Sequence, residues 1–265
     1  MFLPQKYLIN LGSGKLTIFV QKDHMLHKTR GIVLKTTFYG DTGVVVQVFT
    51  EKFGIQSYII NGVRKAKAMV NMNMLQPLHL LEMVVYFKAN TGIQRIKEVQ
   101  PSPVFRSIPY DIIKSTIVMF LNEVLYKSIR QQHTDEQLFD FIYSSIAWFD
   151  ETTDASINFH LAFLLKLTRY LGFAPSTESR IDQHFFDLQE GAFSSRPPIH
   201  PYYMDRTDAL IFIALFSVPM EKLQELQLSK VDRRSILNKI LLFYTLHTAS
   251  FGEIRAHQVL EEVLS

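Results

Sequence analysis

The sequence of 265 residues contains no cysteine. This excludes disulfides, thiolate zinc sites, cysteine-ligated iron–sulfur clusters and cysteine nucleophiles. Because small secreted proteins usually depend on disulfides, the absence favours a cytoplasmic protein. Long hydrophobic runs are also missing. The longest, residues 209–220, has about a dozen residues, whereas a membrane-spanning helix needs roughly 20. We therefore expect buried core helices and no membrane partner.

Enzyme signatures are absent too. Gly12-Ser13-Gly14-Lys15 places a lysine after a glycine, but it lacks the preceding strand and the four-residue spacer of a phosphate-binding loop. The sequence holds no Gly-x-Ser-x-Gly elbow, no His-Glu-x-x-His motif and no Asp-x-Asp cluster. It therefore predicts a protein that is not an enzyme and needs no cofactor. A hydrolase with an unrecognised site is a weaker alternative, which paired carboxylates with split pKa values in a pocket would support.

Charge is unevenly distributed along the chain. Residues 25–100 carry ten Lys and Arg against four Asp and Glu, a net charge of +6. Residues 101–265 carry a net charge of −5, and residues 1–24 carry +2. A basic first part and an acidic second part indicate that the first part meets a polyanion.

The first part has the pattern of β-structure. Period-two, β-branched runs separated by turn residues predict five strands, at Gly31–Phe38, Val44–Thr50, Ile55–Ile60, Leu78–Lys88 and Ile93–Val99. Five strands at this spacing fit a small Greek-key barrel, of which the OB-fold is the common case. The Met-rich segment Arg64–Gln76 lacks the strand pattern. We expect it to plug the barrel, or else to be a loop with Met as gap filler.

After the proline-bearing linker at residues 101–109, the hydrophobic period changes from two to 3.6. Helices are expected at Tyr110–Gln132, Glu136–Phe149, Asp154–Leu171 (closed by Gly172), Arg206–Val218, Met220–Leu226, Ser229–Ser250 and Ile254–Leu264. The predicted fold class is α+β: an OB-fold domain at residues 25–100, then a helical domain at residues 101–265 with an irregular insert at 174–203.

Residues 1–24 make a poor signal peptide, because polar residues and glycines interrupt the apolar stretch. We expect an extension, or a misassigned start, with folding that begins near Met25. The alternative is an additional β-hairpin around Gly12-Ser13-Gly14.

Four motifs carry a family resemblance, and their order and spacing together are more specific than any one of them. They are Lys28–Lys35 followed by Tyr39-Gly40-Asp41, then Phe49–Gly54, then Asn61–Lys65, and finally Tyr170-Leu171-Gly172-Phe173-Ala174-Pro175. In this order they resemble RecO, the bacterial DNA-repair mediator family, over about residues 25–260.

One departure concerns metal binding. Many RecO proteins carry a four-cysteine zinc site just after the Leu–Gly–Tyr–x–Pro segment, but residues 179–193 hold no thiolate. His184 and His200, with Asp182 or Asp187, could in principle bind a metal, yet structural zinc sites favour Cys and His. We expect instead a short β-hairpin with Gly191 at its turn, as in a zinc-free branch of the family.

The resemblance implies a function and partners. A RecO-type protein binds single- and double-stranded DNA, anneals complementary strands and, with RecR, helps load RecA onto strands coated by single-strand-binding protein. The rival hypothesis is a scaffold protein whose barrel binds a protein or an oligosaccharide, because OB-folds accept varied ligands.

Candidate DNA contacts are the basic residues of the barrel, which would neutralise phosphates, and exposed aromatic residues, on which bases stack. The basic set is Lys28, Arg30, Lys35, Lys52, Arg64, Lys65, Lys67, Lys88, Arg95 and Lys97. Of the barrel aromatics Phe38, Tyr39, Phe53, Tyr58, Tyr86 and Phe87, most should be core. Tyr39 and Phe87 are the expected stacking platforms.

The resemblance also places the docking site for the tail of single-strand-binding protein in the helical domain. That tail is acidic and ends in an apolar residue, so its site needs an apolar pocket rimmed by cations. Lys166 and Arg169, with Leu165 nearby, are the candidates on one helix. The alternative is an ordinary exposed helix face.

Overall fold

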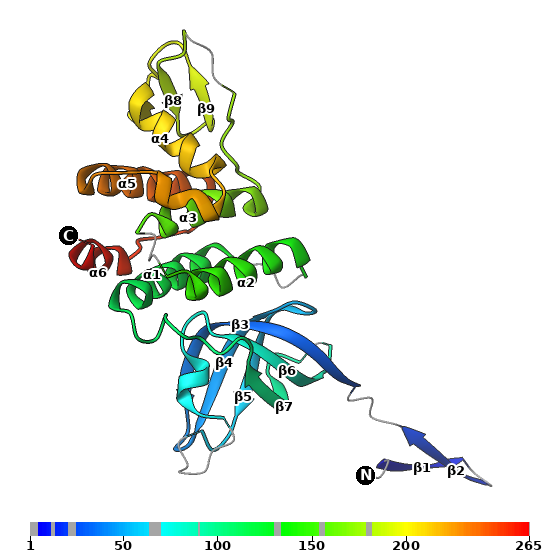
Figure 1. The fold of residues 1–265 in the computed structure, drawn as a ribbon. Coiled ribbons are helices and arrows are strands. Elements are labelled where there is room, and N and C mark those ends of the chain that lie inside the picture. The colour runs from blue at the N-terminus through cyan, green and yellow to red at the C-terminus, as the bar shows by residue number, and fades with distance from the viewer. Residues whose placement is uncertain are drawn as a thin grey trace.

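The structure is a computed structural model. It describes residues 5–11, 14–20, 25–63, 70–89, 91–129, 134–153, 157–178 and 182–264, with side chains from residue 26 onward. Figure 1 shows a barrel covered at one end by successive layers of helices, with a small sheet at the far end.

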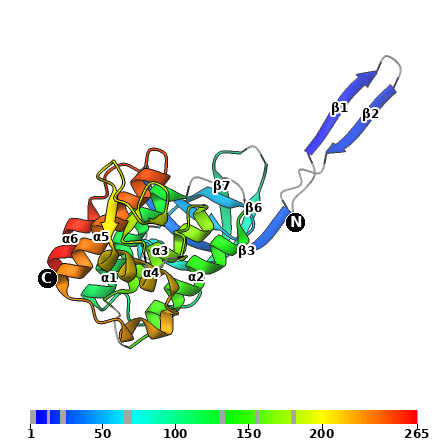
Figure 2. The same cartoon turned by 90° about the horizontal axis from the view of Figure 1, so that it is seen from above.

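The first element is a β-hairpin. Strands β1 (Gln5–Leu11) and β2 (Gly14–Val20) pair antiparallel, from Gln5 opposite Val20 to Leu11 opposite Gly14. The alternative of an additional β-hairpin before residue 25 is therefore present, and the prediction that residues 1–24 are an extension or a misassigned start stays a prediction. Gly12 and Ser13 lie outside the described residues. Figure 2 shows the hairpin apart from the barrel.

The five predicted strands form a closed barrel, in the order β3-β4-β5-β7-β6. They are β3 (Met25–Tyr39), β4 (Gly43–Thr50), β5 (Gly54–Ile60), β6 (Leu80–Phe87) and β7 (Gln94–Pro101). All neighbours pair antiparallel except β5 and β7, which pair parallel. The predicted OB-type barrel is thus confirmed.

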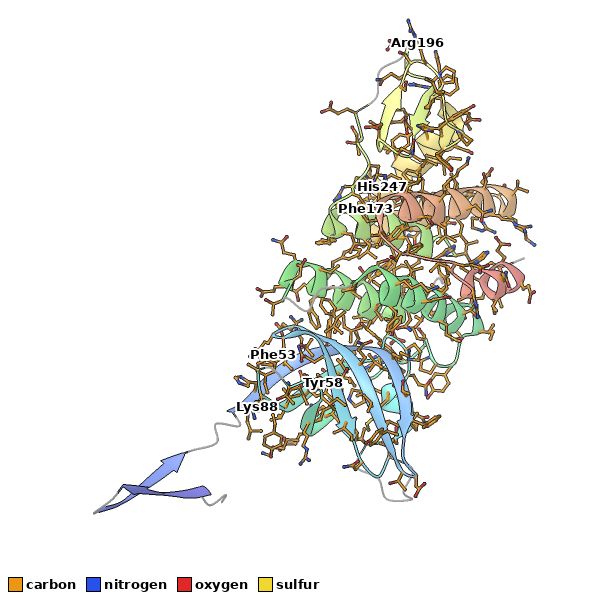
Figure 3. All side chains as sticks on the ribbon, turned by 180° about the vertical axis from the view of Figure 1, so that it is seen from behind. Phe53, Tyr58, Lys88, Phe173, Arg196 and His247 are labelled. Carbon is orange, nitrogen blue, oxygen red and sulfur yellow. The ribbon has the colours of Figure 1, made fainter. Side chains whose placement is uncertain are left out.

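Inward-facing apolar side chains fill the barrel. Its core includes Val33, Val46, Val48, Tyr58, Leu81 and Val85, all fully buried, and Figure 3 labels Tyr58 inside the barrel. The helix η1 (Met72–Leu75) adds Leu75 to this core, and Val70 packs against it. This part of the Met-rich segment plugs the barrel as predicted, while residues 64–69 lie outside the described residues.

The helical part contains α1 (Ile112–Ser128), α2 (Glu136–Glu151), α3 (Phe159–Leu171), α4 (Arg206–Ser217), η2 (Met220–Glu225), α5 (Lys230–His247) and α6 (Ala256–Val263). Asp135 caps α2 by accepting the Leu138 amide, and Ser229 and Asp232 form a capping box on α5. Gly172 ends α3 with a φ of 86°. Within the described ranges, no helix is long and apolar enough to cross a bilayer.

The barrel and the helices share one apolar core. Ile32, Leu34 and Phe49 face outward from β3 and β4 and belong to the same buried cluster as the helical side chains. Phe49 packs against Phe139 of α2, with ring centroids 5.6 Å apart. Burial of this face fixes the barrel against α1 and α2.

The linker before α1 is held in place by two buried charges. The carboxylate of Asp150 accepts the backbone amides of Arg106, Ser107 and Ile108 at 2.7–2.9 Å. Lys114 is 1% exposed, and its Nζ donates to carbonyls at the carboxyl end of α2, including those of Phe149 at 2.9 Å and Thr152 at 2.6 Å. A cation at a helix carboxyl end satisfies carbonyls that lack a partner within the helix.

The irregular insert forms a three-stranded sheet in the order β10-β8-β9. Its strands are β8 (Phe185–Asp187), β9 (Ala192–Ser194) and β10 (Tyr203–Asp205). The predicted hairpin is present, and Gly191 at its turn has a φ of 63°. His200 Nε2 lies 3.2 Å from Asp187 Oδ2. Among the described residues, no group of three or more His, Asp and Glu is arranged to hold a metal.

Candidate nucleic-acid interface

Four of the predicted basic residues of the barrel line two grooves with different charge. The first, called here the β3–β6–β7 groove, has a volume of about 720 Å³ and is lined by Lys28, Thr29, Arg30, Glu51, Lys52, Glu82, Met83, Val84, Glu98, Val99 and Gln100. Its three cations face three carboxylates. Lys97, on the same strand as Glu98, pairs with it at 3.2 Å. This balance gives the groove little net attraction for phosphates.

Arg30 is engaged inside the protein. Its guanidinium pairs with Glu51 at 2.9 Å and with Asp140 of α2 at 2.7 Å. It also lies 5.1 Å and 4.9 Å from the ring centroids of Phe139 and Tyr143. The hydrogen bond to Glu51 raises the pKa of Arg30 and lowers that of Glu51. Arg30 therefore ties the barrel to α2, which argues against the predicted DNA contact.

The second groove, called here the β4–β5 groove, has a volume of about 620 Å³. Its lining consists of Gln47, Ile55, Gln56, Ser57, Phe87, Lys88, Thr91, Gly92, Gln94, Tyr126 and Ile129. The described residues that line it include a lysine and three amides, and none of them is a carboxylate. The second and third strands of an OB-fold, together with the loop between the fourth and fifth, are its usual oligonucleotide face. β4, β5 and the β6–β7 turn occupy those positions.

Two predicted lysines belong to the β4–β5 groove. Lys88 lines it directly, and Figure 3 labels this residue on the barrel. Lys35 lies opposite Gln47 in the β3–β4 register, and its Nζ is 3.4 Å from the hydroxyl of Tyr126. Gln94 is 4% exposed and binds the backbone of Lys88 in both directions, donating at 2.8 Å and accepting at 3.1 Å. These hydrogen bonds tie Lys88, after β6, to Gln94 at the start of β7.

The two aromatic residues expected to stack on bases, Tyr39 and Phe87, differ in how much of the ring is exposed. Tyr39 is 59% exposed at the β3–β4 turn. Phe87 instead stacks on Phe53, with centroids 4.0 Å apart and planes inclined by 12°. Phe87 thus presents only part of its surface to the β4–β5 groove. Lys28, Lys52 and Arg95 are exposed on the barrel. Arg64, Lys65 and Lys67 lie outside the described residues, after Val63 at the end of β5.

The predicted partner residues on α3, Lys166 and Arg169, both contact Phe216. Lys166 Nζ donates to the Phe216 carbonyl at 2.9 Å, and Arg169 lies 4.2 Å from the centroid of the Phe216 ring. Burial lowers the pKa of Lys166. Both side chains join α3 to the end of α4, while Arg169 stays exposed, and their role as partner contacts stays a prediction.

An apolar pocket rimmed by cations lies between α5 and α6. The α5–α6 pocket has a volume of about 210 Å³ and is lined by His160, Lys230, Val231, Arg233, Arg234, Leu237, Leu260, Glu261 and Leu264. Arg234 pairs with Glu261 at 3.1 Å and keeps 70% of its side chain exposed. Burial lowers the pKa of His160 to about 3, so this imidazole is neutral. The positive end of α5 adds to the field of the three cations.

Sequence reasoning missed most of these lining residues. A polar side chain inside an apolar strand, as at Gln47 between Val46 and Val48, is a signal that could have identified the β4–β5 groove. Nothing in the sequence pairs Tyr126 of α1 with a barrel strand. The α5–α6 pocket also depends on helix packing, which the sequence pattern does not specify.

Comparison with known proteins agrees with this architecture. Residues 25–105 match the family model described as "Recombination protein O N terminal", and residues 109–252 match "Recombination protein O C terminal". The β1–β2 hairpin lies before the first match.

Curated relatives match over most of their length. The chain is 35% identical over 240 residues to "DNA repair protein RecO" of Bacteroides fragilis, which covers 90% of the chain and 99% of that protein. It is 34% identical to the protein of the same name from Phocaeicola vulgatus over 241 residues, which covers 91% and 100%. The Flavobacterium psychrophilum protein is 32% identical over 240 residues. With both domain models matched in order across the barrel and the helices, the chain belongs to the RecO family of DNA repair proteins.

Proposed function

We propose that this chain is a non-enzymatic recombination mediator of the cytoplasm that holds single-stranded DNA in the β4–β5 groove. The observation that carries the proposal is the composition of that groove. Among the described residues that line it are a lysine, amides and aromatic rings, and none of these residues is a carboxylate. A channel of this kind attracts a phosphate backbone and accepts any base sequence.

The same surface accounts for strand annealing. Positive charge at the groove would lower the electrostatic repulsion between two phosphate backbones. The proposed contacts are Lys88 and Lys35 at the groove, together with Arg64, Lys65 and Lys67 after β5. Weaker contacts to duplex DNA would come from four exposed basic residues, because carboxylates lie near several of them. These residues are Lys28, Lys52, Arg95 and Lys97. The protein would then present complementary strands to each other, and with RecR it would help RecA to load.

The α5–α6 pocket supports a second part of the function. We propose that it receives the tail of single-strand-binding protein. The apolar floor, Leu237 and Leu260, suits the terminal side chain, and Lys230, Arg233 and Arg234 suit the acidic residues and the carboxylate. Recruitment through this pocket brings the barrel to strands that are already coated.

Measurements of DNA binding test the proposed role of the β4–β5 groove. Fluorescence anisotropy with a labelled single strand should give a log–log salt slope that becomes shallower by about 0.7 in Lys88→Gln, because one phosphate contact is lost. Exposed Lys222 of η2 provides a matched control, and Lys222→Gln should keep the parent slope. Absence of DNA binding at low salt would refute the proposal and favour the scaffold alternative.

The pocket is tested with a labelled acidic peptide that ends in an apolar residue. Leu237→Ser or Arg234→Glu should weaken peptide binding about tenfold or more, because an apolar contact or a cation is lost. Arg169→Gln should leave peptide binding unchanged. If Arg169→Gln abolished binding while Arg234→Glu did not, the tail would dock on α3 and the pocket assignment would be wrong.

A further inference from the structure

Two neighbouring aromatic side chains at the tip of the β3–β4 hairpin are exposed. Phe38 is 61% exposed and Tyr39 is 59% exposed, whereas Phe49 and Tyr58 of the same barrel are buried. Figure 1 shows this tip at the end of the barrel away from the helical layers. Adjacent exposed rings offer a surface on which nucleic-acid bases stack.

The backbone of the hairpin tip that carries these rings is closely packed. The turn is made at Gly40, whose φ of +59° few other residues adopt. Gly43 packs so closely that a Cβ there would lie 2.8 Å from the Tyr39 carbonyl oxygen and 3.4 Å from that of Ile60. The hairpin end is thus packed against the end of β5. Rings held on such a base lose little freedom when they bind.

The two rings belong to opposite faces of the hairpin. Side chains alternate along a strand, so Tyr39 shares the outer face of β3 with Lys35 and Thr37. Phe38 shares the other face with Thr36, whose hydroxyl donates to the Leu75 carbonyl at the barrel core. A tip with one ring on each side has the shape of a wedge.

The tip continues the path of the β4–β5 groove. Gln47 lines the groove and pairs with Lys35, and Gly43 pairs with Tyr39 at the other end of the same ladder. Four residues of extended chain separate Gln47 from Gly43, or roughly 13 Å. Between Lys35 and Gln47 the only carboxylate is Asp41, in the turn itself. The surface leading to the tip therefore suits a phosphate backbone, whereas the tip suits uncharged base faces.

We propose that Phe38 and Tyr39 form a wedge that stacks on the last base pair where duplex DNA opens into a single strand. This inference rests on the proposed binding of that strand in the β4–β5 groove. One strand then follows the Tyr39 face toward Lys35 and Gln47, and the other is turned aside at Phe38. The protein thereby prefers junctions of single- and double-stranded DNA, which are the sites where annealing begins and spreads.

The test compares three labelled substrates by anisotropy: a forked junction, a single strand and a blunt duplex. A 2-aminopurine at the junction reports stacking at the last base pair. The parent protein should bind the fork more tightly than the single strand and change the 2-aminopurine emission. Phe38→Ala/Tyr39→Ala should reduce this preference, the ratio of fork affinity to single-strand affinity, on the order of tenfold, because a base–aromatic stack at the junction is lost.

Controls separate this inference from the groove itself. Tyr110 is 85% exposed before α1, so Tyr110→Ala should keep the fork preference. Phe38→Trp/Tyr39→Trp should restore it, because the stacking surface is retained. If the double alanine variant keeps the fork preference, the wedge is refuted while groove binding stands. If no substrate binds even at low salt, the proposed function fails, and the wedge fails with it.

Discussion

Replacing Arg30 by glutamine distinguishes a structural role for this residue from a DNA contact. Arg30 pairs with Glu51 within the barrel and with Asp140 of α2; these side chains are 24% and 49% exposed, so solvent weakens both pairs. Partly exposed pairs contribute about 0.5 kcal/mol each. The contacts with the rings of Phe139 and Tyr143 contribute similar amounts. Arg30→Gln should therefore lower the free energy of unfolding by about 2 kcal/mol.

Urea denaturation followed by circular dichroism measures this loss. Lys28→Gln is the matched control, since Lys28 lies two residues earlier on the same exposed face of β3, and it should change stability by less than about 0.5 kcal/mol. The salt dependence of single-strand binding should be the same for Arg30→Gln as for the parent. A shallower salt slope, by about 0.7, with unchanged stability would refute the reasoning and return Arg30 to the DNA-binding set.

The same pair has a predictable pH dependence. The hydrogen bond from Arg30 lowers the pKa of Glu51 from the unfolded value near 4.5. The contribution of the pair is therefore complete above about pH 4.5 and is lost as the pH falls through the lowered folded value. The stability difference between the parent and Arg30→Gln should shrink in acid. A difference that stayed constant down to pH 2 would show that the ion pair is not its source.

Three further changes have defined outcomes. Lys114→Met should destabilise the protein by about 3 kcal/mol in urea melts, because buried carbonyls at the end of α2 lose their charged donor; an unchanged midpoint would exclude this capping role. His160 has a pKa lowered to about 3 by burial, so parent stability should decline by up to about 1.4 kcal/mol per pH unit as the pH falls below 6.5. His160→Leu should remove that part of the decline, and equal slopes for both proteins would contradict the burial of a neutral imidazole. Gly191→Ala should cost about 1 kcal/mol, measured by thermal melting, because its φ of +63° strains a residue with a Cβ; a gain in melting temperature would exclude a left-handed turn there.

The location of the partner site shows where sequence reasoning stops. Lys166 and Arg169 lie on one helix with apolar neighbours, which is what a cation-rimmed pocket requires. In the structure their head groups are satisfied by Phe216. The pocket with the required chemistry forms where α6 packs beside the start of α5, residues that lie about 30 positions apart in the chain.

The sequence by itself determined the element types, the order of the elements and the family. Period-two runs with turn residues gave all five barrel strands, and helical periodicity with caps gave the helices, because these signals act over a few residues. The tertiary structure alone decided which charges are available to a ligand. Arg30 is neutralised by a carboxylate 110 residues away, and the β4–β5 groove is completed by Tyr126 of α1. Such pairings depend on how packed elements meet in space, which no local pattern specifies.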